Sequence, residues 1–231
     1  MDFESLKNDI CAVDGGEKLL DEALTHRSYR CENPVKYDNQ RLEFLGDAVL
    51  ELILSEWIYH LYADSREGDL TKARSVLAKE ATLANLAVKL DLGTHLKAGK
   101  GELAAGASTR QSTLADLFEA VLAAYYLACG YRQTKEKLLE LITSCYPDPL
   151  KMVTEANPKG KLQEYTQAAL GCTPKYSVLS ISGTANEPYY QVEAKVNEFT
   201  AAGGGTSRKI AECQAARTLL DFFEKQQSTD K

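Results

Sequence analysis

Through residues 5–144, apolar residues recur every three or four positions, which is the period of an amphipathic helix. No proline interrupts the chain between Val35 and Tyr146, and Gly93 and Gly130 are expected to end helices. This part of the chain is therefore expected to be all-α. The spacing predicts helices over residues 5–10, 19–25, 41–61, 70–90, 113–128 and 134–144.

Two prolines, Pro147 and Pro149, then end the helical pattern. The short segment that follows them, up to Asn157 and Pro158, is interpreted as a linker. The sequence thus predicts a helical domain over residues 1–147 and a linker over residues 148–156.

After this segment the period of apolar residues shortens to two, as in half-buried strands. The expected elements are a helix over 162–170, strands over 176–178, 190–196 and 199–202, and a helix over 207–225. The third strand is expected to stop at the glycines that begin with Gly203. The order α-β-β-β-α predicts a small α+β domain over residues 157–227, followed by a frayed tail, 228–231.

Charge is distributed unevenly between the two parts. The net charge is −6, yet the residues from 157 onward carry 9 Lys and Arg against 8 Asp and Glu, and the preceding residues carry 18 against 25. A mildly basic domain joined to an acidic one can bind nucleic acid, provided that a metal neutralises the acids.

Cysteine, histidine and apolar content exclude several classes of protein. The six cysteines are scattered without a C-x-x-C motif, so they are interpreted as reduced thiols, and the three histidines are too far apart to suggest a zinc site. No apolar run approaches the roughly 18 residues of a membrane helix, and the first residues are too polar for a secretory signal. A cytoplasmic protein without a membrane span is expected.

Acidic residues occur on single faces of two predicted helices. Glu43 and Asp47 are four positions apart, and Asp116 and Glu119 are three apart, so each pair shares a helix face. Such spacing usually marks a solvated stripe, which Glu51 would continue. The second pair, however, lies among apolar residues, so we interpret both pairs as polar islands in packed helices.

If these islands face each other, four carboxylates converge and raise one another's pKa. A hard divalent cation removes that penalty. Oxygen ligands without His or Cys suit Mg²⁺, with Mn²⁺ as a substitute, better than Zn²⁺. Such a metal polarises a phosphate and lowers the pKa of a bound water, which is the chemistry of phosphodiester hydrolysis.

Several blocks, in order along the chain, resemble the ribonuclease III family. The blocks similar to its nuclease domain are ALTHRSY (23–29), NQRLEFLGDAVLELILSEW (39–57), REGDLTKARSVL (66–77), LGTHLKAGKGE (92–102) and STLADLFEAVLAAYYL (112–127). The blocks NPKGKLQEYTQ (157–167), YYQVEAKV (189–196) and GGGTSRKIAECQAA (203–216) resemble the double-stranded RNA-binding domain that follows it in bacterial members.

The resemblance implies an endoribonuclease that cleaves double-stranded RNA as a homodimer. Its chemistry would be Mg²⁺-dependent attack of water that leaves 5′-phosphate and 3′-hydroxyl ends, in the processing of ribosomal RNA precursors and messenger RNA. At the matching positions, Glu43, Asp47, Asp116 and Glu119 would bind metal, and Asp47 and Glu119 would be catalytic.

Three further positions take their expected roles from the same resemblance. Phe44 would be the aromatic residue that inserts into the partner subunit, for which a core phenylalanine is the alternative. Glu67 matches an accessory acid near the cleavage valley. Gln40 stands before Arg41 where the family usually has an acid, and a neutral amide does not supply that negative charge.

The second domain carries the expected contacts to RNA. A reader of A-form RNA needs hydrogen-bonding side chains for the minor groove and cations for phosphates. Arg208 and Lys209 open the last predicted helix, where the helix N-terminus adds attraction for phosphate. Asn186 lies in the loop SGTANEP where the family commonly has a histidine. The residues that match the family's minor-groove contacts are Gln163, Glu164 and Gln167.

Two other functions remain open at this point. The first is a non-catalytic RNA-binding or scaffold protein built on the same two domains, in which Gln40 would be the first acid lost from the site. The four retained acids argue against this alternative. An unrelated helical hydrolase is disfavoured because the chain contains no nucleophile elbow, P-loop or H-E-x-x-H motif.

Overall fold

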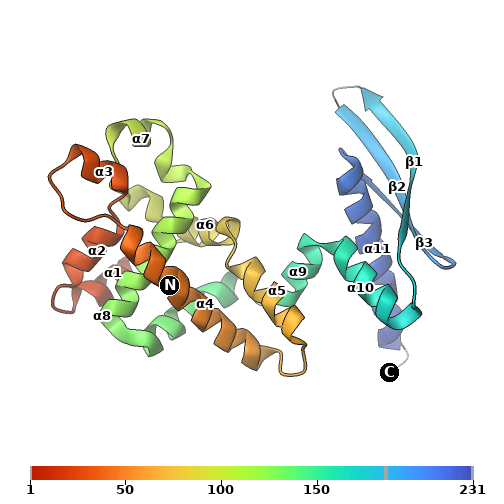
Figure 1. The fold of residues 1–231 in the computed structure, drawn as a ribbon, viewed down its shortest axis with the longest axis horizontal. Helices are drawn as coiled ribbons and strands as arrows, with labels where there is room; N and C mark the ends of the chain where they lie inside the picture. The colour runs from red at the N-terminus through yellow and green to blue at the C-terminus, as the bar shows by residue number, and fades with distance from the viewer. Residues whose placement is uncertain (1, 185–186, 230–231) are drawn as a thin grey trace. The chain divides into compact units, whose positions relative to one another are not determined.

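The computed structural model describes residues 2–184 and 187–229. The chain divides into two compact units, Met1–Leu150 and Lys151–Lys231, and Figure 1 shows the helices of the first and the sheet of the second. The predicted fold class, an all-α domain followed by a small α-β-β-β-α domain, is confirmed.

Where the apolar period is long, the helices of the first unit follow the predicted ones. They are α1 (Phe3–Cys11), α2 (Gly16–Ala23), α3 (Arg27–Glu32), α4 (Gln40–Leu61), α5 (Glu67–Leu77), α6 (Glu80–Lys89), α7 (Lys100–Ala104) and α8 (Gln111–Cys145), with 3₁₀ turns η1 (Leu92–His95) and η2 (Ala107–Thr109). The sequence did not predict α3 and α7, because six and five residues are too few for a period to show.

The single helix expected over residues 70–90 was wrong, because the chain breaks between α5 and α6. Lys79 has an extended backbone with ψ of 141°, and the Thr82 hydroxyl donates to the Val76 carbonyl at 2.8 Å across the break. Val76, Leu77 and Leu83 are all buried. Apolar residues keep the helical spacing on both sides of this break, so the sequence pattern does not reveal where one helix ends and the next begins.

α8 joins two predicted helices across Gly130, where φ of 80° interrupts the helical geometry at the predicted stop. Among the described helices, α8 meets the length and hydropathy criteria for a membrane span, which we expected of no segment. However, 61% of its apolar window is buried inside the protein, where α8 packs against α4 and α6. This burial is typical of a core helix.

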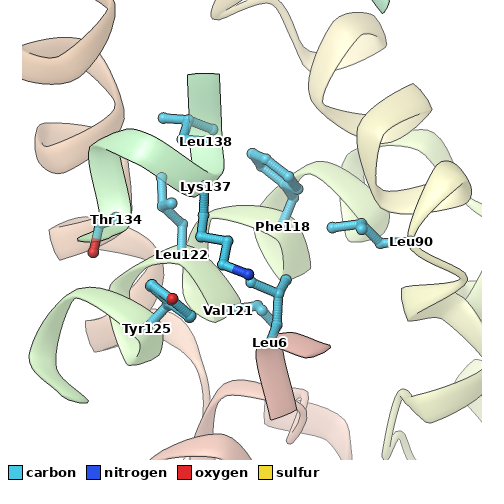
Figure 2. Close-up of a pocket in the computed structure, with 9 residues that line it drawn as sticks. All are labelled: Leu6, Leu90, Phe118, Val121, Leu122, Tyr125, Thr134, Lys137 and Leu138. Atoms are coloured by element: carbon cyan, nitrogen blue, oxygen red, sulfur yellow. The ribbon is translucent and has the colours of Figure 1, made fainter. Parts of the chain in front are cut away.

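A small cavity of about 20 Å³ lies beside α8. In Figure 2 the side chains of Leu6, Leu90, Phe118 and Leu138 surround it; they come from α1, the residue that follows α6 and the two halves of α8. A cavity of this size has room for a single water at most; its lining is mainly apolar, with Tyr125, Thr134 and Lys137 as the residues that carry polar groups. The cavity is an imperfection in the packing of the core and is too small to bind a substrate.

The second unit packs two helices on an antiparallel sheet of strand order β1-β2-β3. Its elements are α10 (Pro158–Leu170), β1 (Lys175–Thr184), β2 (Glu187–Val196), β3 (Phe199–Gly205) and α11 (Arg208–Thr229). The core combines Leu162, Val196 and the alanines Ala215 and Ala216 of α11.

Three details of this region differ from the expectations. The first strand was expected over 176–178 and runs from Lys175 to Thr184 as β1. The segment predicted as a linker, 148–156, contains a helix that was not predicted, α9 (Pro149–Ala156); a proline at a first helical position is compatible with helix formation. β3 continues through Gly203 to Gly205 rather than stopping before them. A Cβ on Gly203 would collide with the backbone of Ala215, so this glycine permits close approach of α11 to the sheet rather than ending the strand.

Candidate active site

The backbones of α4 and α8 touch where the acidic residues lie. A Cβ on Gly46 would stand 3.0 Å from the Glu119 Cα and nearer still to the Glu119 carbonyl carbon and oxygen, closer than real Cβ atoms approach backbone. Glycine is therefore required at position 46 for this contact. Because the two helices meet here, the acids of both helices converge on one place.

Three of the four predicted acids form one cluster. The carboxylate oxygens of Glu43, Asp116 and Glu119 lie within 4.8 Å of one another, whereas Asp47 is exposed and lies outside this set among the described residues. Asp47 is nevertheless close enough for its charge to raise the pKa of Glu119. The two acidic pairs thus face each other, with Asp47 at the edge of the group.

The cluster is electrostatically strained without a cation. Burial, followed by the charges of Asp47, Asp116 and Glu43, raises the pKa of Glu119 to about 8. Burial also raises the pKa of Glu43, where the Asp116 charge adds to the shift and the Arg27 guanidinium opposes it. Burial and then Glu80 raise the pKa of Asp116. Each shift disfavours the ionised form, so these carboxyl groups would gain most from a nearby positive charge.

The donor set fits a hard divalent cation. All three donors are carboxylate oxygens, and no histidine or cysteine joins the cluster in the part of the chain that the structure describes. Oxygen atoms on opposite sides of Mg²⁺ lie about 4.2 Å apart, a spacing compatible with this group. The geometry therefore suits Mg²⁺ or Mn²⁺ and gives no support to a zinc centre.

An open cleft of about 710 Å³ adjoins the cluster. Glu43 and Asp116 line it together with Gln40, Arg27 and His26, so the cleft has both acidic and basic walls. The Gln40 backbone N–H donates to the Asp38 carboxylate at 3.3 Å. Position 40, where the family usually has an acid, thus lies in the cleft wall, and its side chain is the neutral amide of Gln40.

Arg27 and His26 were missed as site residues by the sequence reasoning. Both belong to the block ALTHRSY, which carried part of the family resemblance but suggested no site residue. Both lie at least 16 positions before the acids in the sequence. Burial lowers the pKa of His26, which favours its neutral form. Arg27 therefore contributes positive charge to the cleft, which Arg30 and Arg110 also line.

Two other predicted residues, Glu67 and Phe44, do not belong to the three-carboxylate cluster. Glu67 begins α5, is exposed, and accepts a hydrogen bond from the Thr71 hydroxyl at 2.8 Å. Phe44 is 80% exposed, which excludes the alternative of a core phenylalanine. Leu52 and Tyr59, also exposed, fall on the same side of α4 as Phe44 at helical spacing. α4 thus has an apolar outer face beside the acidic cluster.

The second unit exposes most of the residues predicted to contact RNA. Arg208 and Lys209 are exposed at the start of α11. The Arg208 Nε donates to the Glu212 carboxylate at 2.8 Å, a contact that was not predicted. Asn186 lies outside the described residues. The three predicted minor-groove residues are all exposed on α10: Gln163, Glu164 and Gln167.

Comparisons with known proteins agree with this arrangement. The family model described as Ribonuclease-III-like matches residues 16–145, and the Double-stranded RNA binding motif matches residues 158–222. Ribonuclease 3 of Natranaerobius thermophilus is 43% identical over 214 residues, covering 90% of this chain and 91% of that protein. Ribonuclease 3 of Oleidesulfovibrio alaskensis is 38% identical over 224 residues, covering 96% of this chain and 98% of that protein.

A solved structure is similar to the first unit. It is the nuclease domain of ribonuclease III from Campylobacter jejuni, described with reference to flexibility in a region involved in dimer formation. The TM-score is 0.57 and the identity 36%, covering 64% of this chain and 100% of that one.

Proposed function

The chain belongs to the ribonuclease III family and is an endoribonuclease with a double-stranded RNA-binding domain, and from that premise we propose that it hydrolyses double-stranded RNA with Mg²⁺. Glu43, Asp116 and Glu119 would hold the ion, and the products would carry 5′-phosphate and 3′-hydroxyl ends. The observation that carries the proposal is the convergence of these three carboxylates beside an open cleft.

Within this site, each acid has a distinct task. When bound, Mg²⁺ supplies a Lewis acid that polarises the phosphate and lowers the pKa of water. Glu119, whose pKa is raised to about 8 by burial and then by the neighbouring carboxylates, would hold the ion in its ionised form, because a bound cation favours the charged carboxylate. Asp47 remains outside the three-carboxylate set and is our choice for orienting the attacking water and accepting its proton. Asp47 and Glu119 are thus the proposed catalytic pair.

Gln40 and Glu67 are proposed to modulate the reaction rather than to perform it. Gln40 lines the cleft without charge, so it would bind a ribose hydroxyl or a water through its amide. Glu67 is exposed at the start of a helix and would act near the substrate, outside the metal set. Because the inner acids are retained, we expect an active nuclease, which also argues against the non-catalytic alternative.

The second domain is proposed to bind the RNA duplex by its shape. Gln163, Glu164 and Gln167 would hydrogen-bond across the minor groove, where A-form RNA exposes its 2′-hydroxyls. Arg208 and Lys209 would contact phosphates at the N-terminus of α11. Asn186 is proposed as a further contact. Binding of this kind releases counterions and weakens steeply as the salt concentration rises.

The proposed active form is a homodimer joined through the outer face of α4. Phe44 is large, apolar and 80% exposed, so its burial against a second copy would recover hydrophobic free energy that the single chain leaves unused. We also propose that the protein acts in the cytoplasm, on ribosomal RNA precursors and messenger RNA.

Cleavage of a long duplex RNA by the purified protein tests this function. We expect fragments in Mg²⁺ or Mn²⁺, none in EDTA, and 5′ ends that a phosphatase makes available for kinase labelling. Duplex DNA of the same sequence serves as the control substrate. A protein that binds the RNA duplex but leaves it intact in both metals would contradict the nuclease and favour the scaffold alternative.

A further inference from the structure

One carboxylate joins the N-terminal ends of α10 and α11 in the second unit. Glu212 accepts a hydrogen bond from Lys159 Nζ at 2.5 Å through one oxygen and from Arg208 Nε at 2.8 Å through the other. Lys159 is the second residue of α10, and Arg208 is the first of α11. The two cations, 49 positions apart in the sequence, are thereby tied to a single anion.

Glu212 is nearly buried, with 9% of its surface exposed. A buried carboxylate is costly unless it is paired and hydrogen-bonded. Burial opposes its ionisation, yet the hydrogen bonds from Lys159 and Arg208 outweigh that effect and lower the pKa of Glu212. The group is therefore a fixed negative charge inside the domain and not a solvated surface acid.

Lys159 supports Glu212 from the inner side. Its Nζ lies 4.6 Å from the centroid of the Tyr176 ring, a cation–π distance, and 35% of its side chain is exposed. Burial raises the pKa of Tyr176 to about 12, so the ring that faces the ammonium is neutral. Lys159 is thus held between Glu212 and Tyr176.

Arg208 lies on the outer side, with 63% of its side chain exposed. Its bond to Glu212 uses Nε. An arginine side chain has five N–H donors in a planar fork, and four of them belong to the terminal nitrogens. The carboxylate therefore fixes the plane of the guanidinium while the terminal nitrogens remain suited to a bidentate contact with an oxyanion.

We propose that Glu212 is a positioning residue for RNA binding, which orients Arg208 so that its terminal nitrogens meet a phosphate of the RNA duplex. This inference rests on the proposed function of the second domain. Ordering the guanidinium before binding removes part of the entropy cost of immobilising a long side chain. The three groups keep one net positive charge, because Lys159 offsets Glu212, so attraction for phosphate is retained.

A simple charge argument makes the opposite prediction. Removing a negative charge near two cations strengthens the attraction for a polyanion, and Glu212→Gln would then bind RNA more tightly with a steeper salt dependence. The positioning role predicts weaker binding and a shallower dependence, since Arg208 no longer holds its contact. The two effects differ in sign and are separated by one measurement.

The experiment is a double-mutant cycle on the full-length protein with a short RNA duplex, in EDTA and over a series of salt concentrations. We expect Arg208→Gln to weaken binding and to reduce the slope of log K against log salt by about 0.9, the value for one phosphate contact. Glu212→Gln should show most of that loss, and the double variant should bind no more weakly than Arg208→Gln. Glu198→Gln removes an exposed acid of the same domain and should bind like wild type.

Tighter binding by Glu212→Gln, an unchanged slope or additive losses would overturn the inference. Circular dichroism and thermal unfolding report whether each variant folds. If Glu212→Gln does not fold, Arg208→Lys gives a second test, because a lysine ammonium lacks the planar fork that engages Glu212 and a phosphate together. The RNA affinity of Arg208→Lys should fall to that of Arg208→Gln. A wild-type affinity in Arg208→Lys would overturn the inference. Wild-type protein that fails to bind the duplex would instead contradict the proposed function.

Discussion

Gly46 in α4 lies directly against the backbone of Glu119 in α8, and a Cβ at position 46 would stand 3.0 Å from the Glu119 Cα. This contact sets how closely the two acid-bearing helices approach. The cluster of Glu43, Asp116 and Glu119 therefore depends on a residue that carries no functional group of its own.

Gly46→Ala is expected to damage both stability and activity. The added methyl group must displace backbone, so the free energy of unfolding should fall by about 1–3 kcal/mol, and the cleavage rate should fall because Glu119 moves from its partners. Thermal unfolding and duplex cleavage measure the two effects. Gly68→Ala is the matched control, because a Cβ there meets nothing within 4 Å. A Gly46→Ala protein with wild-type stability and activity would contradict the role of this contact.

The raised pKa of Glu119 predicts an unusual pH dependence for the metal-free protein. Its folded pKa of about 8 exceeds the ordinary glutamate value of about 4.5, so the neutral group favours the folded state, and this stabilisation is lost as the pH rises from about 4.5 through 8. The melting temperature in EDTA should therefore fall across this window more in wild type than in Glu119→Gln.

Mg²⁺ should reverse that trend. Because protons compete with the metal for the carboxylates, Mg²⁺ should raise the melting temperature more at pH 8 than at pH 5.5. Glu51→Gln, which removes an exposed acid one turn beyond Asp47 on α4, should behave like wild type. If the melting temperature of Glu119→Gln depends on pH and Mg²⁺ as wild type does, Glu119 is not the group responsible.

Much of this site was predictable from the sequences of α4 and α8. Both are long helices with a clear apolar period, so acidic residues within them stand out from the pattern. The sequence paired Glu43 with Asp47 and Asp116 with Glu119 from spacing along each helix. It did not reveal that Asp47 lies outside the three-carboxylate set, since that depends on the contact between helices.

Other features were hidden for equally specific reasons. The ion pair of Lys159 with Glu212 joins residues 53 positions apart, and only the fold brings them together. Gly203 was interpreted as the end of a strand, because glycine commonly ends regular elements. The structure shows instead that glycine is required there because α11 packs directly against it. The helix α9 follows Pro147 and begins at Pro149, and closely spaced prolines more often mark irregular chain.

Phe44→Ala is expected to weaken the proposed homodimer with little effect on the fold of each subunit. The side chain is 80% exposed, so its removal costs the single chain little packing, whereas it would remove the proposed contact with the partner. Sedimentation velocity over a concentration series should show a shift toward monomer. Leu103→Ala, another exposed apolar side chain of the first unit, should sediment as wild type. An unchanged dimer in Phe44→Ala would remove Phe44 from the interface.

Gln40→Glu restores an acid to the cleft wall. The added negative charge lies near Glu43, so we expect half-maximal cleavage at a lower Mg²⁺ concentration, by a few-fold. Titrating Mg²⁺ in single-turnover cleavage measures this change. Gln133→Glu, an exposed site on the second half of α8, controls for the added charge. An identical Mg²⁺ dependence in Gln40→Glu and wild type would show that this position does not influence the metal.

The most direct test of the metal-dependent nuclease is single-turnover cleavage of a labelled RNA duplex by wild type and Glu119→Gln, with duplex binding measured on the same samples. The account predicts a loss in cleavage rate of about 10²–10⁴-fold with binding retained, because the acid belongs to the first unit and the proposed RNA-binding residues belong to the second. Glu51→Gln should cleave at the wild-type rate. Undiminished cleavage by Glu119→Gln would contradict the account.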